Sequence, residues 1–189
     1  TPGSGTKNDQ IVFASIAEDG TVSSYDTVVS NGSGSDMHAV YAIGAGSTNT
    51  IKGGLGSSVL LESAQEVLNA QGGGKNFITG GDVSVQTTAS NSKAVYATGS
   101  ASENSIDALQ SVTITSNMHG VSANGGGRNS IKGNDITIEA GNNADAYGVY
   151  ATGSGTANDI DARSGQLTIS AGKHALFAEA GGKNTVTGD

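Results

Sequence analysis

The sequence repeats a short pattern about every 27 residues. Each copy has an aliphatic residue, an alanine two places later, a glycine-rich stretch, and then an asparagine two places before another aliphatic residue. The asparagines that mark the six copies lie at steps of 27, 28, 25, 29 and 26 residues: Asn49, Asn76, Asn104, Asn129, Asn158 and Asn184. A near-constant period of this length is typical of a solenoid, in which each repeat forms one coil stacked on the previous one.

Alternating apolar residues predict three short strands in each repeat, because alternate side chains of a strand share one face. The first strand carries two inward columns: Val40, Leu68, Val95, Val121, Val149 and Leu176, then Ala42, Ala70, Ala97, Ala123, Ala151 and Ala178. The second carries Ile51, Ile78, Ile106, Ile131, Ile160 and Val186. The third carries the pairs Val59/Leu61, Val83/Val85, Val112/Ile114, Ile136/Ile138 and Leu167/Ile169. We therefore predict an all-β fold, a parallel β-helix (β-solenoid). We expect it to be right-handed, the usual hand for coils of this length and irregularity.

The chain divides into two predicted regions. Residues 37–189 form about six repeats, and we expect a C-terminal truncation, because Asp189 falls part-way through a turn. Residues 1–36 fit the pattern poorly and are predicted to form an irregular N-terminal turn or cap. Asn8 and Ile11 are a stretched version of the asparagine–aliphatic pattern, and Val22, Val28 and Val29 are candidates for a further strand. We expect the chain to be a segment of a longer protein.

The repeated asparagines are predicted to be structural. An asparagine at the same corner of every coil can donate an amide hydrogen bond to one neighbour and accept one from the other, which forms a ladder along the stack. Two places after the aliphatic residue that follows each asparagine, a small residue is predicted to allow a tight corner. These small residues are Gly53, Gly80, Ala108, Gly133, Ala162 and Gly188.

Composition excludes several classes of function. The net charge is -8 and there is no basic run, so nucleic acid is not an expected partner. No apolar run approaches the ~20 residues that span a bilayer, so we do not expect this chain to be membrane-embedded. The absence of cysteine excludes disulfides, thiol catalysis and cysteine-bound zinc.

Metal ions and cofactors are not expected. His38, His119 and His174 share a column but lie two or three coils apart, too far for one zinc ion. The glycine-rich loops carry Asn76 and Asn129 where a calcium-binding repeat needs aspartate. A single ion near Asp135 or Asp145 is left open.

Acidic residues raise the possibility of an enzyme. Asp159 and Asp161 flank the inward Ile160 and point outward, and Asp107 lies in the column of Asp161 two coils away. Paired carboxylates can cleave glycosides. The copies between and beside them carry other residues in that column, namely Lys52, Thr79, Lys132 and Thr187. We therefore expect no catalytic residues and interpret the acids as a solvated face.

Two surfaces are candidates for binding. Tyr41, Tyr96, Tyr150 and Phe177 share an outward column with Asn69 and Ser122, and Tyr147 lies beside Tyr150. Tyrosine is favoured in recognition because it combines a rigid ring with a hydroxyl. The alternative is that an outward strand position simply favours aromatic side chains. Arg128 and Lys132, with Lys52 and Lys75 near them, form a second group that could bind an acidic sugar.

The repeat typified by residues 148–160, Gly-Val-Tyr-Ala followed by a glycine-rich corner and Asn-x-Ile, resembles passenger segments of bacterial autotransporter (type V secretion) adhesins. The resemblance covers residues 37–189 and is one of pattern. It implies a right-handed β-helix on the outer face of a Gram-negative cell, anchored in the outer membrane through a translocator domain that this chain lacks.

From these features we expect a cell-surface adhesin rod. It would attach cells to a host receptor, to matrix or to a glycan, or bind an identical molecule on a neighbouring cell and so promote aggregation and biofilm formation. We expect the fragment to be a monomer in solution. The alternative is a polysaccharide-degrading β-helix enzyme, a lyase or glycoside hydrolase. The fold alone does not choose between these functions.

Overall fold

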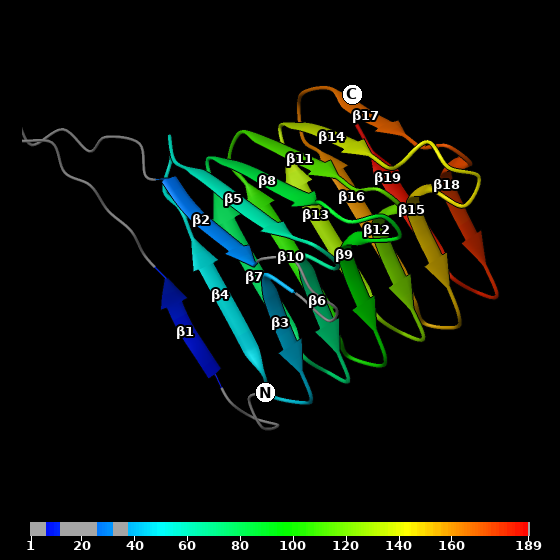
Figure 1. Cartoon of the computed structure of the whole chain (residues 1–189), viewed down its shortest axis with the longest axis horizontal. Helices are drawn as coiled ribbons and strands as arrows, with labels where there is room; N and C mark the ends of the chain where they lie inside the picture. The colour runs from blue at the N-terminus through cyan, green and yellow to red at the C-terminus, as the bar shows by residue number, and fades with distance from the viewer. Residues whose placement is uncertain (1–6, 12–25, 32–37, 189) are drawn as a thin grey trace, which may run out of the picture.

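A computed structural model of the chain describes residues 7–11, 26–31 and 38–188. These residues form an all-β solenoid in which three parallel sheets run the length of the stack, with one strand of each sheet in each coil (Figure 1). The predicted fold class is therefore confirmed. No helix in the described ranges is long and apolar enough to cross a membrane.

Sheet 1 contains the first strand of each repeat. Its strands, in spatial order, are β3 (Val40–Ile43), β6 (Leu68–Gln71), β9 (Lys93–Thr98), β12 (His119–Asn124), β15 (Tyr147–Thr152) and β18 (His174–Glu179). Every neighbouring pair is parallel and aligns equivalent residues of successive repeats.

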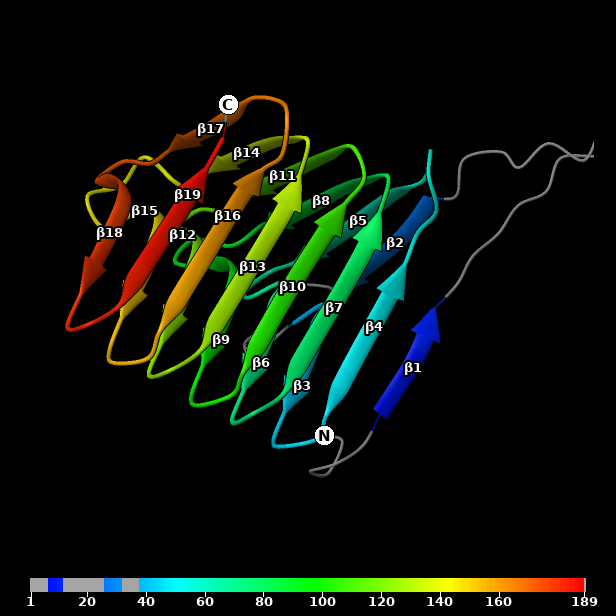
Figure 2. The same ribbon diagram turned by 180° about the vertical axis from the view of Figure 1, so that it is seen from behind.

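Sheet 2 contains the second strands and lies in front in Figure 2. Its order is β1 (Lys7–Ile11), β4 (Thr48–Lys52), β7 (Lys75–Gly80), β10 (Glu103–Ala108), β13 (Arg128–Gly133), β16 (Ala157–Ala162) and β19 (Lys183–Thr187). The ladder asparagines occupy one register position throughout this sheet.

Sheet 3 contains the third strands. Its order is β2 (Asp26–Asn31), β5 (Ser58–Ser63), β8 (Asp82–Thr87), β11 (Ser111–Thr115), β14 (Asp135–Glu139) and β17 (Leu167–Ser170). The connections from sheet 3 to the next coil differ in length between coils, as expected for the loop that collects insertions.

The coils are right-handed. In Figure 2 the strands of sheet 2 point upward on the near side, sheet 3 crosses the top, and sheet 1 descends on the far side. The N-terminal coils lie at the right and the C-terminal coils at the left. Viewed from the N-terminal end, the chain therefore turns clockwise as it recedes.

The core is a narrow column of aliphatic side chains between the three sheets. The inward residues that the sequence predicts are buried throughout the middle coils, and Leu61, Ile106 and Ile131 are fully buried. Leu167 and Ile169 are only partly buried, and Leu176 is 46% exposed, because no described coil stacks on the last one. Burial of apolar area by stacking is the main force that joins successive coils.

The small residues at the end of the sheet 2 strands have a different cause from the one predicted. Gly53, Gly80 and Gly133 do not have positive φ angles, so the corner makes no demand that only glycine meets. A Cβ atom added to Gly133 would lie 3.1 Å from a methyl group of Val112. The neighbouring coils hold a buried alanine, Ala108, at this position. Close packing against the sheet 3 valines therefore limits the side-chain size.

The six asparagines form a continuous ladder inside sheet 2. Each Nδ2 donates to the Oδ1 of the next asparagine, from Asn49 to Asn184, at 2.8–2.9 Å. The second Nδ2 hydrogen donates to a carbonyl oxygen in sheet 1 of the same coil, as between Asn104 and Tyr96 at 2.8 Å. Asn76, Asn104 and Asn158 are fully buried. The ladder therefore both connects the coils and ties sheet 2 to sheet 1 within each coil.

Two strands lie within the region predicted as an irregular N-terminal turn or cap. In β1, Asn8 aligns with Asn49 and Ile11 with Ile51, with a one-residue irregularity between Asp9 and Ile11. In β2, Val29 aligns with Leu61. The stretched pattern thus continues both ladders by one more strand, whereas Val22 lies outside the described residues.

The connections from sheet 1 to sheet 2 alternate in length. Four residues form the connections 44–47, 99–102 and 153–156, whereas three residues form 72–74, 125–127 and 180–182. The true repeat of the structure is therefore a pair of coils, and along one edge of the stack every second corner is shorter by one residue (Figure 1).

Candidate binding surface

The outer face of sheet 1 carries most of the aromatic side chains. We define the aromatic strip as His38, Tyr41, Tyr96, His119, Tyr147, Tyr150, His174 and Phe177. Within the described residues, every tyrosine and phenylalanine except Phe77 belongs to it. Parallel pairing produces this strip, because it brings equivalent outward positions of successive repeats side by side, as with Tyr150 and Phe177.

The C-terminal half of the strip is a layer of five rings. Tyr147 lies at its centre, with ring-centroid distances of 5.0 Å to Tyr150, 5.1 Å to Phe177, 5.1 Å to His119 and 5.8 Å to His174. Most of these ring planes lie within 20° of one another, which is a stacked arrangement. The rings therefore hold each other in place before any ligand binds.

The N-terminal half of the strip is more polar. The Lys93 ammonium lies 4.0 Å above the centre of the Tyr96 ring, which is a cation–π contact, and 3.9 Å from the Glu66 carboxylate. His38 Nδ1 lies 3.4 Å from the other oxygen of that carboxylate. This half therefore combines two tyrosines with paired charges.

Two members of the predicted outward column are not exposed. Asn69 and Ser122 are 1% and 2% exposed, so the prediction that this column is accessible throughout is wrong. Each short side chain lies in register between two coils that carry a tyrosine, and the taller neighbours cover it. The amide of Asn69 also lies 3.4 Å from His38 Nδ1.

His119 is buried within the strip and uncharged near neutral pH. Burial, and then the positive charge of Lys93, lower the pKa of His119 from 6.5 to about 4, although Asp145 partly opposes this shift. The backbone N–H of Tyr147 donates to His119 Nδ1 at 3.4 Å, which requires an unprotonated nitrogen there. His119 therefore acts as a fifth neutral ring in the layer.

We expect acid to weaken the fold through His119. Between pH 6.5 and about 4 the unfolded chain binds a proton at this residue and the folded chain does not. Its contribution is therefore complete above pH 6.5 and is lost as the pH falls towards 4, by on the order of 2 kcal/mol. His119→Tyr, which copies Tyr147 of the next coil, should remove this part of the pH dependence. Urea unfolding of both proteins across this range measures the difference, and parallel pH curves would contradict the assignment.

Two further side chains border the strip. The Tyr150 hydroxyl donates to Glu179 at 2.5 Å, and burial followed by this hydrogen bond raises the pKa of Tyr150. The Lys173 ammonium lies 5.1 Å from the centre of the Tyr147 ring and 3.7 Å from Asp145. The rim of the strip is therefore charged and the centre is aromatic, which is the usual anatomy of a recognition surface.

The other candidate residues lie on different faces. Tyr147 separates His119 from His174 in their column, and the described part of the chain holds no group of three or more acidic or histidine residues placed for a metal ion. Asp135 Oδ1 accepts a hydrogen bond from the backbone of Gln166 at 2.8 Å. Neither Asp135 nor Asp145 is thus brought to a second carboxylate by a recorded contact.

The carboxylates of sheet 2 alternate with basic residues. In one outward column Asp107, Lys132 and Asp161 follow each other on β10, β13 and β16. Asp107 is paired with Arg163, which also donates to the Ala108 carbonyl oxygen at 2.9 Å. The predicted acids are thus outward but are interrupted by, or paired with, positive charges.

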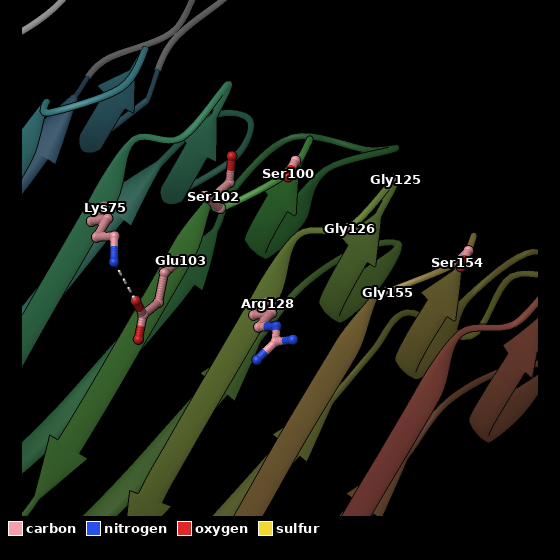
Figure 3. Close-up of a pocket in the computed structure, with 10 residues that line it drawn as sticks. Lys75, Ser100, Ser102, Glu103, Gly125, Gly126, Arg128, Ser154 and Gly155 are labelled. Atoms are coloured by element: carbon pink, nitrogen blue, oxygen red, sulfur yellow. Dashed lines mark hydrogen bonds and ion pairs between the residues drawn. The ribbon is translucent and has the colours of Figure 1, made fainter.

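A groove runs across the corner between sheets 1 and 2, where the three-residue loop 125–127 lies between two longer loops. It has a volume of about 470 Å³ (Figure 3). Ser100 and Ser154 stand on its two walls, the Arg128 guanidinium projects into its mouth, and Lys75 pairs with Glu103 at 3.1 Å. Sequence reasoning missed this groove, although comparison of alternate rather than adjacent repeats reveals the loop-length pattern.

The fold and surface define a β-solenoid with an aromatic strip on one outer face and a polar groove along one corner. Comparison of the chain with protein-family models, with curated proteins and with solved structures finds no match.

Proposed function

We propose that this protein is a binding rod of the adhesin type, which acts on the surface of a bacterial cell. It attaches the cell to a host receptor, to matrix or to another copy of itself on a neighbouring cell, and thereby promotes aggregation and biofilm formation. The observation that carries the proposal is the five-ring layer around Tyr147.

The ring layer suits recognition for an energetic reason. Tyr147, Tyr150 and Phe177 are half-buried, so part of each ring is accessible, while mutual stacking fixes their orientation. A partner that binds ordered side chains loses less conformational entropy than one that must order them. Many copies of a stiff rod on one cell would add avidity to a weak single contact.

The resemblance to autotransporter passenger segments supports the extracellular location. It is a resemblance of repeat pattern and fold, so the location belongs to the proposal. A polysaccharide-degrading enzyme is the alternative. Lys132 between Asp107 and Asp161, and the ion pair of Asp107 with Arg163, favour binding over hydrolysis, because both hold the outward acids in their charged state.

The proposal predicts that the rings are needed for attachment. Beads coated with the protein should clump or attach to cells, and the double variant Tyr147→Ser, Tyr150→Ser should reduce this by about tenfold or more, as loss of central aromatic anchors does. Serine already occupies the Tyr150 column at Ser122, so the sheet accommodates it.

The matched control is Leu55→Ser, which removes a side chain that is 75% exposed at another corner. It should attach like the unmodified protein. A folded double variant that attaches normally would overturn the proposal. Shortening of a polysaccharide by the unmodified protein would instead support the enzyme.

A further inference from the structure

Positive charge is concentrated on one face of the solenoid. The chain has a net charge of -8. Most of the basic residues whose side chains the structure describes nevertheless lie on or over the outer face of sheet 2: Lys52, Lys75, Arg128, Lys132, Arg163 and Lys183. The overall acidity of the chain therefore does not describe this face.

The unpaired basic side chains all belong to this face. Lys93 and Lys173 on the sheet 1 side contact Glu66 and Asp145, and Lys75 and Arg163 are also paired. In the described part of the chain, the basic residues for which no carboxylate partner is found are Lys52, Arg128, Lys132 and Lys183. Their charge is available to an anion from outside.

The two-coil alternation spaces these cations regularly. Lys75, Arg128 and Lys183 each follow a three-residue loop and directly precede a ladder asparagine, so they take the same register position on β7, β13 and β19. Successive members lie two coils apart, about 10 Å at the usual strand spacing. Each cation stands below a shortened corner, where neighbouring longer loops form walls.

Two hollows meet at Arg128. The corner groove of Figure 3 lies on one side, with the Ser100 and Ser154 hydroxyls on its walls. A second groove of about 500 Å³ lies further along sheet 2 and is lined by Ser130, Asp159, Lys183 and Thr185. Lys75 partly neutralises Glu103 between the grooves at 3.1 Å, so the Arg128 guanidinium keeps its donors for another carboxylate.

We propose that this face binds a linear acidic polysaccharide that carries one carboxylate on every second sugar. Arg128 and Lys183 bind successive carboxylates, while serine, threonine and the acids Glu103 and Asp159 accept and donate hydrogen bonds to sugar hydroxyls. An extended pyranose residue is close in length to one coil, so the two repeats stay in step. This inference names a ligand class for the proposed adhesin and therefore rests on that function.

A hydroxyl-rich polymer with sparse charge fits better than nucleic acid. Double-stranded DNA carries one charge per about 1.7 Å of its axis, far denser than cations spaced two coils apart. Glu103 and Asp159 would repel such a backbone, whereas they can accept hydrogen bonds from sugar hydroxyls.

The test uses hyaluronan and unsulfated chondroitin oligosaccharides, with their carboxyl-reduced forms as neutral controls. Calorimetry at physiological ionic strength is appropriate, because screening over about 8 Å suppresses long-range repulsion by the net charge. At least one acidic form should bind, and its reduced form should not. Arg128→Gln and Lys183→Gln should each weaken binding by about tenfold, the loss of one charge-assisted contact. Lys93→Gln, on sheet 1, should leave binding unchanged.

Absence of binding by both acidic probes would overturn the inference, as would equal binding of the reduced forms or unchanged affinity in a folded Arg128→Gln variant. Attachment that depends on Tyr147 without any binding of these probes would refute this inference alone. Binding of the probes without attachment or clumping would refute the adhesin function and leave the polysaccharide site in place.

Discussion

Gly127→Ala should strongly destabilise the protein. A Cβ atom at this position would overlap the carbonyl group of Ala97 and lie 2.9 Å from the backbone nitrogen of Thr98 in the preceding coil. Both atoms belong to the backbone of sheet 1, so they cannot move without disturbing the pairing of β9 with β12. We expect a loss of about 3 kcal/mol in the free energy of unfolding, at the upper end of overpacking effects. Urea unfolding followed by circular dichroism measures it.

Gly133→Ala is the matched control in the same coil. Its Cβ would lie 3.1 Å from the nearest methyl group, and the equivalent positions of the adjacent coils already hold Ala108 and Ala162. It should change stability by less than about 1 kcal/mol. Equal effects of the two substitutions would show that the close approach at Gly127 does not limit the stacking of these coils.

Loss of a central ladder residue should be comparably severe. Asn104→Ala leaves the Asn76 amide without its acceptor, the Asn129 Oδ1 without its donor and the Tyr96 carbonyl oxygen without a partner. The Asn104 side chain is fully buried, so water cannot replace these bonds. At about 1–3 kcal/mol for each buried group left unpaired, the total should be about 4 kcal/mol. Urea unfolding again provides the measurement.

Position along the stack supplies the controls. Asn124→Ala removes an exposed asparagine from the same sheet 1 edge and should cost less than about 0.5 kcal/mol. Asn184→Ala lies at the last described rung and is only partly buried, so its effect should fall between the two. A cost at Asn104 no larger than at Asn124 would mean that the ladder does not stabilise the stack.

Most of the fold could be predicted because the repeat encodes it locally. The alternation of Val95 with Ala97, and the spacing of Asn104 and Ile106, are properties of a few adjacent residues that recur in each coil. Parallel in-register stacking then follows, because equivalent residues of identical coils must align.

The features that sequence reasoning missed depend on neighbouring coils. Ser122 is buried because its neighbours in the column are tyrosines, and the pKa of His119 is lowered by its burial and by Lys93, a residue of the preceding coil. Arg163 reaches Asp107 across two coils, 56 residues away. Such contacts follow from the order of the coils, whereas the average repeat erases them.

The alternation of corner loops also limits how the length of this molecule can change. Removal of a single coil would bring two loops of equal length together and would disrupt both the notch that holds Arg128 and the approach that requires glycine at position 127. Removal or duplication of a pair restores every contact. Homologues or engineered versions of different reach should therefore differ in steps of 54 or 55 residues, the spacing of Asn49, Asn104 and Asn158.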